Sequence, residues 1–355
     1  RDDAFDLPML AAYLPMMEAS ALVTAGKLGL FEALADGPRD LETLARTVLA
    51  DEIGVRRLAA FLVETGHLQR RGALVGNAPN TTRWFTSRGI VDYGAGLIWT
   101  ADAWTIMGDL AQAVRRGGPD ALLWHKMTQA PEIGARFAAY MRAFAEHLTP
   151  DLLRLLPVPD GASRLLDLGG SHGLHAMALC HANPALHAVI VDLESALGDT
   201  EAQIEAQALS DRITVRPGDV RALDWGDGYD IVLYLSIAHN LLPEENARIF
   251  AHLAGVMRPG GVLVIHDYPA ETTPALFRSA FDLTLLVETG TRTFAYAEFE
   301  SMLMQAGFRD LWLHPLLPAE KGSLIIARLY KEAGLPDGLF NVIAGDRHLV
   351  TDILT

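Results

Sequence analysis

Short apolar runs alternate with segments of helical periodicity from residue 163 onward. The helical segments include Glu201–Leu209 and Glu244–Met257. This alternation predicts a mostly parallel sheet with helices on both faces, with the ligand outside the carboxyl ends of the strands. The predicted strands are Arg164–Leu168, Ala188–Asp192, Ile213–Arg216, Ile231–Leu235, Val262–Ile265, Leu311–Leu313 and Leu324–Ala327.

The N-terminal part has a different pattern, in which apolar residues recur at helical spacing. The pattern predicts one helix over Pro8–Leu34, a short helix from Asp40 and a third over Gly54–Glu64. Residues 66–77 then predict two short strands around Gly72. Three helices followed by a small hairpin are typical of a winged helix, which either binds DNA or serves as a packing or dimerisation module.

The region between these two parts, residues 90–156, is again helical and rich in aromatic residues. Such residues either form core or cover a pocket for a flat substrate. We therefore expect four regions: a helical winged-helix dimerisation domain (1–100), a helical connector lining the substrate pocket (101–160), a cofactor-binding α/β domain (161–329) and an appendage of unknown role (330–355).

Composition narrows the class of partner. The chain has 355 residues, of which 50% are hydrophobic, and a formal net charge of −15. An acidic surface disfavours nucleic acids and anionic membranes, whose phosphates attract basic side chains. The single cysteine, Cys180, is expected to be a core residue in a reducing compartment. Since no apolar segment is long enough to span a membrane and no signal-peptide pattern is seen, we expect a cytoplasmic location.

The chemistry-bearing residues begin at the end of the first predicted strand, in the run Asp167-Leu-Gly-Gly-Ser-His-Gly173. Gly169 and Gly170 let the backbone approach a ligand, and the helix that follows offers free N–H groups. The spacing differs from the G-x-G-x-x-G that binds a pyrophosphate. Asp167 suits a cofactor with an amino-acid end and a sulfonium charge. Asp192 ends the next strand, where a carboxylate can bind ribose hydroxyls, and Asp219 follows the third, where an acid can bind an adenine amino group.

A histidine follows the fourth predicted strand at the same edge of the sheet. This residue, His239, is well placed to act as a general base. Asp267 ends the next strand and could hold the His239 ring in one tautomer. A metal pair at His266 and Asp267 is the alternative, which no motif with metal-ligand spacing supports. We expect His172 and His175 to lie on a helix surface, although His172 also falls within the glycine turn.

The segments DLGGSHG, VDLESAL, GDV, AHNLLPEE, RPGGVLVIHD and TGTRTFAYAEFESMLMQAGF resemble the small-molecule O-methyltransferases of the caffeate and hydroxyindole type. The resemblance covers about residues 5–329. It implies a Rossmann-like seven-stranded class I methyltransferase fold, a homodimer built by the N-terminal domain, S-adenosyl-L-methionine as cofactor and no metal. His239 would be the base and Asp267 its orienting carboxylate. The expected cofactor contacts are Asp167, Gly169, Gly170, Asp192, Leu193, Asp219, Val220 and Ser236, and the expected substrate contacts are Phe137, Met141 and Asn240.

The chain departs from the family pattern at three places. His239 is followed by Asn240-Leu241 instead of Asp-Trp, and Leu235 replaces a lysine that touches the adenine in plant members. Thr293-Phe294-Ala295 stands where many plant members carry a Glu-Arg-Thr stretch. We therefore predict methyl transfer to a hydroxyl of a small aromatic or polyketide-like natural product. The alternative keeps the fold and cofactor but shifts the chemistry to N- or C-methylation, decarboxylation or hydroxylation.

Three further readings have less support. A regulatory protein that uses the winged helix is disfavoured by the acidic charge. Hydride transfer is disfavoured by the spacing of the glycines. Residues 331–346 resemble a short aldehyde dehydrogenase segment, but the segment is too short to act alone and lacks that family's catalytic cysteine.

Overall fold

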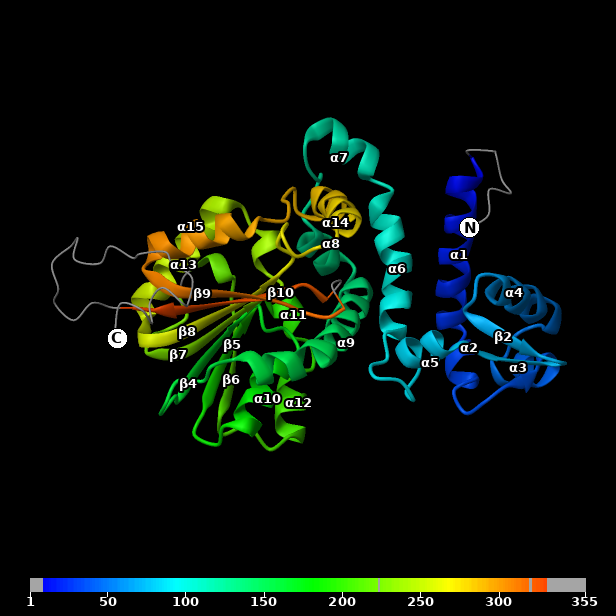
Figure 1. Cartoon of the computed structure of the whole chain (residues 1–355), viewed down its shortest axis with the longest axis horizontal. Helices are drawn as coiled ribbons and strands as arrows, with labels where there is room; N and C mark the ends of the chain where they lie inside the picture. The colour runs from blue at the N-terminus through cyan, green and yellow to red at the C-terminus, as the bar shows by residue number, and fades with distance from the viewer. Residues whose placement is uncertain (1–8, 223, 319–320, 331–355) are drawn as a thin grey trace, which may run out of the picture.

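The fold is taken from a computed structural model that describes residues 9–222, 224–318 and 321–330 (Figure 1). The appendage after Tyr330, including the 331–346 segment, lies outside the described residues. In the N-terminal part, helices surround a three-stranded sheet of order β1-β3-β2. Its elements are α1 (Leu10–Lys27), α2 (Leu30–Ala33), β1 (Arg39–Asp40), α3 (Leu41–Thr47), α4 (Glu52–Glu64), β2 (Leu68–Arg71) and β3 (Leu74–Asn77).

Local chemistry sets the ends of these helices. The Asp40 carboxylate accepts a hydrogen bond from the Thr43 N–H at 2.8 Å, and that of Asp51 accepts one from the Ile53 N–H at 2.9 Å. Both are N-caps, which satisfy free N–H groups in the first turn. The prediction of one helix over Pro8–Leu34 is wrong, because the chain breaks at Gly29 in the left-handed region (φ 65°) and restarts as α2.

The middle of the chain is helical, with α6 packed between α1 and the long helix α9 (Figure 1). Trp99 of α6 and Phe137 of α9 meet edge to face, with ring centroids 4.9 Å apart. The aromatic residues here therefore form core and, as described below, also line a cavity. The helices are α5 (Pro79–Phe85), α6 (Gly94–Met107), α7 (Leu110–Arg116), α8 (Leu123–Gln129) and α9 (Pro131–Leu155).

The C-terminal part contains a seven-stranded sheet of order β6-β5-β4-β7-β8-β10-β9. The pairs from β6 to β8 are parallel, and β10 runs antiparallel to both of its neighbours. The strands are β4 (Arg164–Leu168), β5 (His187–Asp192), β6 (Ile213–Pro217), β7 (Tyr229–Leu235), β8 (Met257–Asp267), β9 (Phe308–Pro315) and β10 (Ser323–Leu329). The predicted fold class is confirmed, although each of the six strands after β4 is longer than predicted.

Helices cover both faces of this sheet (Figure 1). The two faces carry separate cores because neighbouring strand residues point to opposite sides. Leu165 joins the core beneath α9 and α10, whereas Leu166 joins the core beneath α13 and α15. The helices are α10 (Leu174–Ala182), α11 (Glu194–Leu197), α12 (Thr200–Ala206), α13 (Pro243–Val256), α14 (Ala275–Glu288) and α15 (Tyr296–Ala306).

The strand order fixes where a ligand can bind. From β4 the chain moves outward to β5 and β6, and it then returns to the other side of β4 with β7. The crevice at the carboxyl ends of β4 and β7 is therefore the switch point of the sheet.

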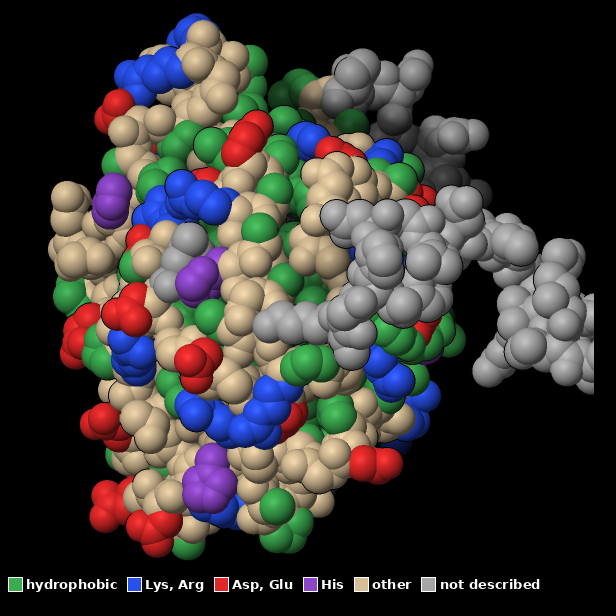
Figure 2. Space-filling view, turned by 90° about the vertical axis from the view of Figure 1, so that its left-hand side faces the viewer, with side chains coloured by type: hydrophobic (Ala, Val, Ile, Leu, Met, Phe, Trp, Pro, Cys, Tyr) green, Lys and Arg blue, Asp and Glu red, His purple; other side chains and the backbone are tan. Residues whose placement is uncertain are grey.

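On the face shown in Figure 2, basic side chains lie among acidic ones. None of the helices within the described ranges is long and apolar enough to cross a membrane.

Candidate active site

The turn after β4 has room for glycine only. Gly169 has a φ of 72°, and a Cβ built there would lie 2.1 Å from Cδ1 of Ile237. A Cβ on Gly170 would lie 2.6 Å from the carboxyl carbon of Asp167. Gly173 (φ 66°) then precedes α10. The backbone of the turn is thus held against β7 on one side and Asp167 on the other.

Two buried acids lie beneath this turn. One carboxylate oxygen of Asp167, Oδ2, has no hydrogen-bond partner, and burial together with the nearby charge of Asp192 raises the pKa of Asp167 to about 7. Asp192 accepts hydrogen bonds from the N–H groups of Ser171 at 2.9 Å and Leu193 at 2.7 Å. Burial nevertheless raises its pKa to about 6. The unpaired, buried Asp167 oxygen favours a ligand that donates hydrogen bonds or carries positive charge.

The third predicted acid, Asp219, is held by a neighbour. Its carboxylate accepts hydrogen bonds from the backbone N–H and the guanidinium of Arg221, at 2.6–3.0 Å. These bonds lower the pKa of Asp219, so it is ionised at neutral pH. The predicted contact with an adenine amino group remains a prediction, and that group would share the carboxylate with Arg221.

These elements enclose a cavity of about 160 Å³, here called the cofactor cavity. Every residue predicted as a cofactor contact lines it: Asp167, Gly169, Gly170, Asp192, Leu193, Asp219, Val220 and Ser236. They come from the ends of β4, β5, β6 and β7, which parallel pairing brings to one edge of the sheet.

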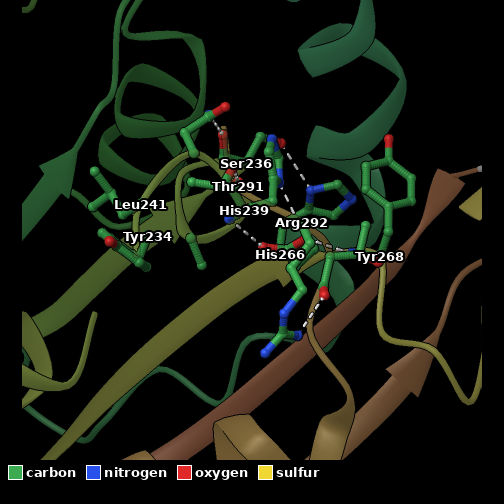
Figure 3. A network of polar contacts seen from close by, with 12 residues as sticks. Tyr234, Ser236, His239, Leu241, His266, Tyr268, Thr291 and Arg292 are labelled. Atoms are coloured by element: carbon green, nitrogen blue, oxygen red, sulfur yellow. Dashed lines mark hydrogen bonds and ion pairs between the residues drawn. The ribbon is translucent and has the colours of Figure 1, made fainter. Parts of the chain in front are cut away.

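Figure 3 shows His239 near His266 and Tyr268 at the same edge of the sheet. The ring of His239 contacts the Asp267 carboxylate. His239 follows β7 in a short 3₁₀ turn (Ala238–Asn240), and Asp267 ends β8. Asp267 Oδ1 lies 3.1 Å from His239 Nδ1, and Oδ2 accepts the His239 backbone N–H at 3.1 Å. Because Asp267 is fully buried and accepts only, Nδ1 carries the proton and Nε2 is left with a free lone pair.

The histidine is fixed from other directions as well. The Thr291 hydroxyl donates to the His239 carbonyl, and the Phe281 ring packs edge-on against the imidazole at 5.0 Å between centroids. His239 itself is 6% exposed. The ring therefore has one orientation, which a positioned base requires.

The neighbouring histidine, His266, is structural. Its ring nitrogens pair with the Ser236 hydroxyl at 2.9 Å and the Lys321 carbonyl at 2.8 Å, and burial lowers its pKa to about 4. Within the described ranges no group of three potential ligand side chains could hold a metal. The surface position expected for His175 is wrong, whereas His172 lies in the glycine turn as expected. His175 is buried and bonds Thr149 at 2.9 Å, and His172 lines the cofactor cavity.

A second cavity of about 450 Å³ adjoins the first and is called here the acceptor cavity. His239 and aromatic side chains of α6, α9 and α14 line it. The predicted substrate contacts Phe137, Met141 and Asn240 lie in the wall common to both cavities, together with Trp124, Phe144 and Ser236. The structure thus brings the predicted cofactor and substrate residues to two sides of one junction.

Sequence reasoning missed the contribution of α14 to this cavity. Phe277, Phe281 and Glu288 of that helix all line it, as does Tyr268 just after β8. The signal present in the sequence was the acid Glu288, which follows the apolar run Leu285-Leu286-Val287. An acid after an apolar run is common on the solvated face of an amphipathic helix, so its position alone did not identify a site.

Comparisons with known proteins identify the family of this chain. The family model described as an O-methyltransferase domain matches residues 107–309, and the O-methyltransferase dimerisation domain matches residues 13–87. An L-tyrosine C(3)-methyltransferase of Streptomyces lavendulae is 30% identical over 82% of this chain and 79% of its own length. A 3-hydroxy-5-methyl-1-naphthoate 3-O-methyltransferase of Streptomyces sahachiroi is 25% identical over 83% of this chain and 87% of its own.

A solved structure shares the fold. Human N-acetylserotonin methyltransferase in complex with S-adenosylmethionine superposes with a TM-score of 0.80 over 93% of this chain and 100% of that one, at 20% identity. The match extends over the helical N-terminal part as well as the sheet.

Proposed function

Because the chain belongs to the family of S-adenosylmethionine-dependent O-methyltransferases, we propose that it transfers a methyl group to a hydroxyl of a small aromatic or polyketide-like natural product. The observation that carries this proposal is the free Nε2 of His239, held by Asp267 at a cavity that adjoins the glycine-lined one. Two relatives of 25–30% identity are named for methyl transfer to a hydroxynaphthoate and to tyrosine, which are aromatic acceptors with hydroxyl groups.

The residues of the cofactor cavity fit this cofactor. The unpartnered Asp167 oxygen suits the ammonium of its amino-acid end, and Asp192 retains lone pairs for the ribose hydroxyls. Gly169 and Gly170 leave space that a Cβ would fill. Asp219 and Val220 would hold the adenine. When bound, S-adenosylmethionine supplies a methyl group already activated by a positively charged sulfur.

The acceptor cavity would supply the base and orient the acceptor. His239 Nε2 takes the proton of the acceptor hydroxyl, and Asp267 stabilises the imidazolium that results. The aromatic walls exclude water and orient the acceptor, which lowers the entropic part of the barrier. A positioned base of this kind contributes about 10²–10⁴-fold to the rate.

C-methylation beside a phenol hydroxyl is the second candidate, because the relative at 30% identity carries that activity in its name. The same base serves both reactions. A deprotonated phenol carries negative charge on its oxygen and on the ortho carbons, so whichever atom lies in line with the methyl group receives it.

We also propose that the chain is a homodimer, since the dimerisation domain match covers residues 13–87. Helix α1 supports this, because it exposes Tyr13 and Met16, and Met9 just before it is exposed as well. Exposed apolar side chains grouped along one helix are typical of a protein interface.

The base is tested by His239→Gln, assayed with ¹³C-methyl S-adenosylmethionine and a set of phenols. Turnover should fall about 10²–10⁴-fold, the contribution of a positioned base. Affinity for S-adenosylhomocysteine, measured by calorimetry, should stay within about twofold, because His239 does not line the cofactor cavity. Wild-type turnover in this variant would exclude His239 as the base. The NMR shift of the transferred methyl group separates O- from C-methylation.

A further inference from the structure

One acid in the acceptor cavity has no role in the mechanism above. Glu288 is the last residue of α14 and lines the cavity together with His239. Within the described residues its carboxylate has no hydrogen-bond donor and no ion-pair partner. It is close enough to His239 for the two side chains to interact electrostatically. Burial raises its pKa to about 7, as expected for an acid in an apolar cavity.

The nearby cation is already paired. Lys126 of α8 lies 2.9 Å from the Asp109 carboxylate, so its charge is largely compensated there. The proton on His239 Nδ1 likewise faces Asp267. A carboxylate placed in a cavity without a donor from the protein costs free energy unless a ligand supplies that donor.

The walls around Glu288 are aromatic. Tyr268 packs against Phe277 and Phe281, with ring centroids 5.3 and 5.1 Å apart. Tyr140 of α9 also lines the cavity and lies within electrostatic range of Glu288. Aromatic faces attract flat rings and also cations, which interact with the negative face of the ring. An acid among aromatic rings is therefore a good environment for an amine attached to an aromatic ring.

We propose that Glu288 is a specificity-determining residue that binds a basic amine on the substrate, so that the preferred acceptor is an aromatic hydroxyl compound bearing such an amine. This inference rests on the proposed function. His239 then faces the hydroxyl of the acceptor and Glu288 faces its amine. His239 lies in the turn after β7 and Glu288 at the end of α14, so the acceptor would be bound at two points of the cavity.

The test uses two phenols of nearly equal shape. Tyramine ends its side chain in an amine, and tyrosol ends the same side chain in a hydroxyl. Their dissociation constants are measured by calorimetry on the full chain saturated with S-adenosylhomocysteine, so that no turnover is needed. A charge-assisted hydrogen bond contributes about 1.5–3 kcal/mol, or about 10–150-fold in affinity. The wild-type protein should therefore bind tyramine at least about tenfold more tightly than tyrosol.

The Glu288→Gln variant should lose that preference, with tyrosol affinity within about threefold of wild type. Glu288→Asp should recover part of it, because the charge is retained. Glu205→Gln, on the exposed face of α12, is the matched control and should change neither affinity.

Equal or unmeasurable binding of the two probes by the wild type would overturn the inference. So would a preference that survives Glu288→Gln. A separate turnover assay with S-adenosylmethionine is the second readout, and an equal loss of kcat for both probes in Glu288→Gln would also overturn the inference, because it would indicate a second base. Absence of methyl transfer from the wild type, with the binding preference intact, would instead refute the proposed function alone.

Discussion

Replacing Asp267 by Asn is the sharpest test of how the base is held. The Asp267 carboxylate accepts three hydrogen bonds: from His239 Nδ1 and the His239 N–H, each at 3.1 Å, and from the Tyr268 N–H at 2.8 Å. An asparagine has the same shape but offers one acceptor oxygen and one donor group. One side of its amide must therefore face an N–H group of the protein or the ring nitrogen of His239.

Each orientation of the amide has a cost. If its NH₂ faces the His239 ring, Nδ1 must accept, the proton moves to Nε2 and the base is lost. If its NH₂ faces the His239 backbone, two donors meet in a fully buried place. Loss of a hydrogen bond to a charged group costs about 1.5–3 kcal/mol, or about 10–150-fold. A positioned base contributes about 10²–10⁴-fold to the rate, and this contribution is lost when Nδ1 has to accept. We therefore expect kcat to fall by about 10²-fold or more.

The assay is steady-state methyl transfer at saturating cofactor, with S-adenosylhomocysteine affinity as a second readout. That affinity should stay within about threefold, since Asp267 does not line the cofactor cavity. Asp230→Asn is the matched control. Asp230 also accepts backbone N–H groups, from Ser163 and Arg164, but at the opposite end of the sheet. A kcat for Asp267→Asn within threefold of the Asp230→Asn value would refute the reasoning.

Three further outcomes follow from the structure. Gly169→Ala should abolish S-adenosylhomocysteine binding by calorimetry, because its Cβ would lie 2.1 Å from Ile237 Cδ1 at a φ of 72°; retained binding would contradict this. The raised pKa of Asp167, about 7, means that ionisation destabilises the ligand-free fold, so its melting temperature should fall as pH rises from 5 to 8. This fall should be smaller in Asp167→Asn. The double variant Tyr13→Glu/Met16→Glu should be a monomer by light scattering, since both exposed side chains lie on α1.

The sheet and the cofactor cavity could be predicted from the sequence for a physical reason. In a parallel sheet the residue at the carboxyl end of each strand reaches the same edge, so locating the strand ends also locates the site. The positions of Asp192 and Asp219 in the cofactor cavity follow from this rule alone, because each lies at or just after the end of a parallel strand. The division of the chain into four regions stays a prediction, as do the roles of the individual site residues.

The acceptor cavity could not be predicted in the same way. Its walls come from α6, α9 and α14, which are far apart in sequence and meet only through tertiary packing. A helix pattern shows which face is apolar but not what that face contacts. His175 shows the same limit, because its burial depends on Thr149 of α9 and not on its own helix. The break at Gly29 was missed because helical spacing continues on both sides of it.

Which atom receives the methyl group depends, in the proposed mechanism, on how the acceptor lies at the wall between the two cavities. Asn240 and Met141 line both cavities, whereas His239 and Glu288 line only the acceptor cavity. In the proposed mechanism His239 removes the proton, and an amine bound at Glu288 would set how far the ring reaches toward the junction. If anchoring governs the position, Glu288→Gln should change the ratio of O- to C-methylated product from an amine-bearing phenol. A weakened base, as in Asp267→Asn, should slow both products equally. Mass spectrometry of the labelled products distinguishes these results, and an unchanged ratio in Glu288→Gln would show that the junction alone fixes the position of the acceptor.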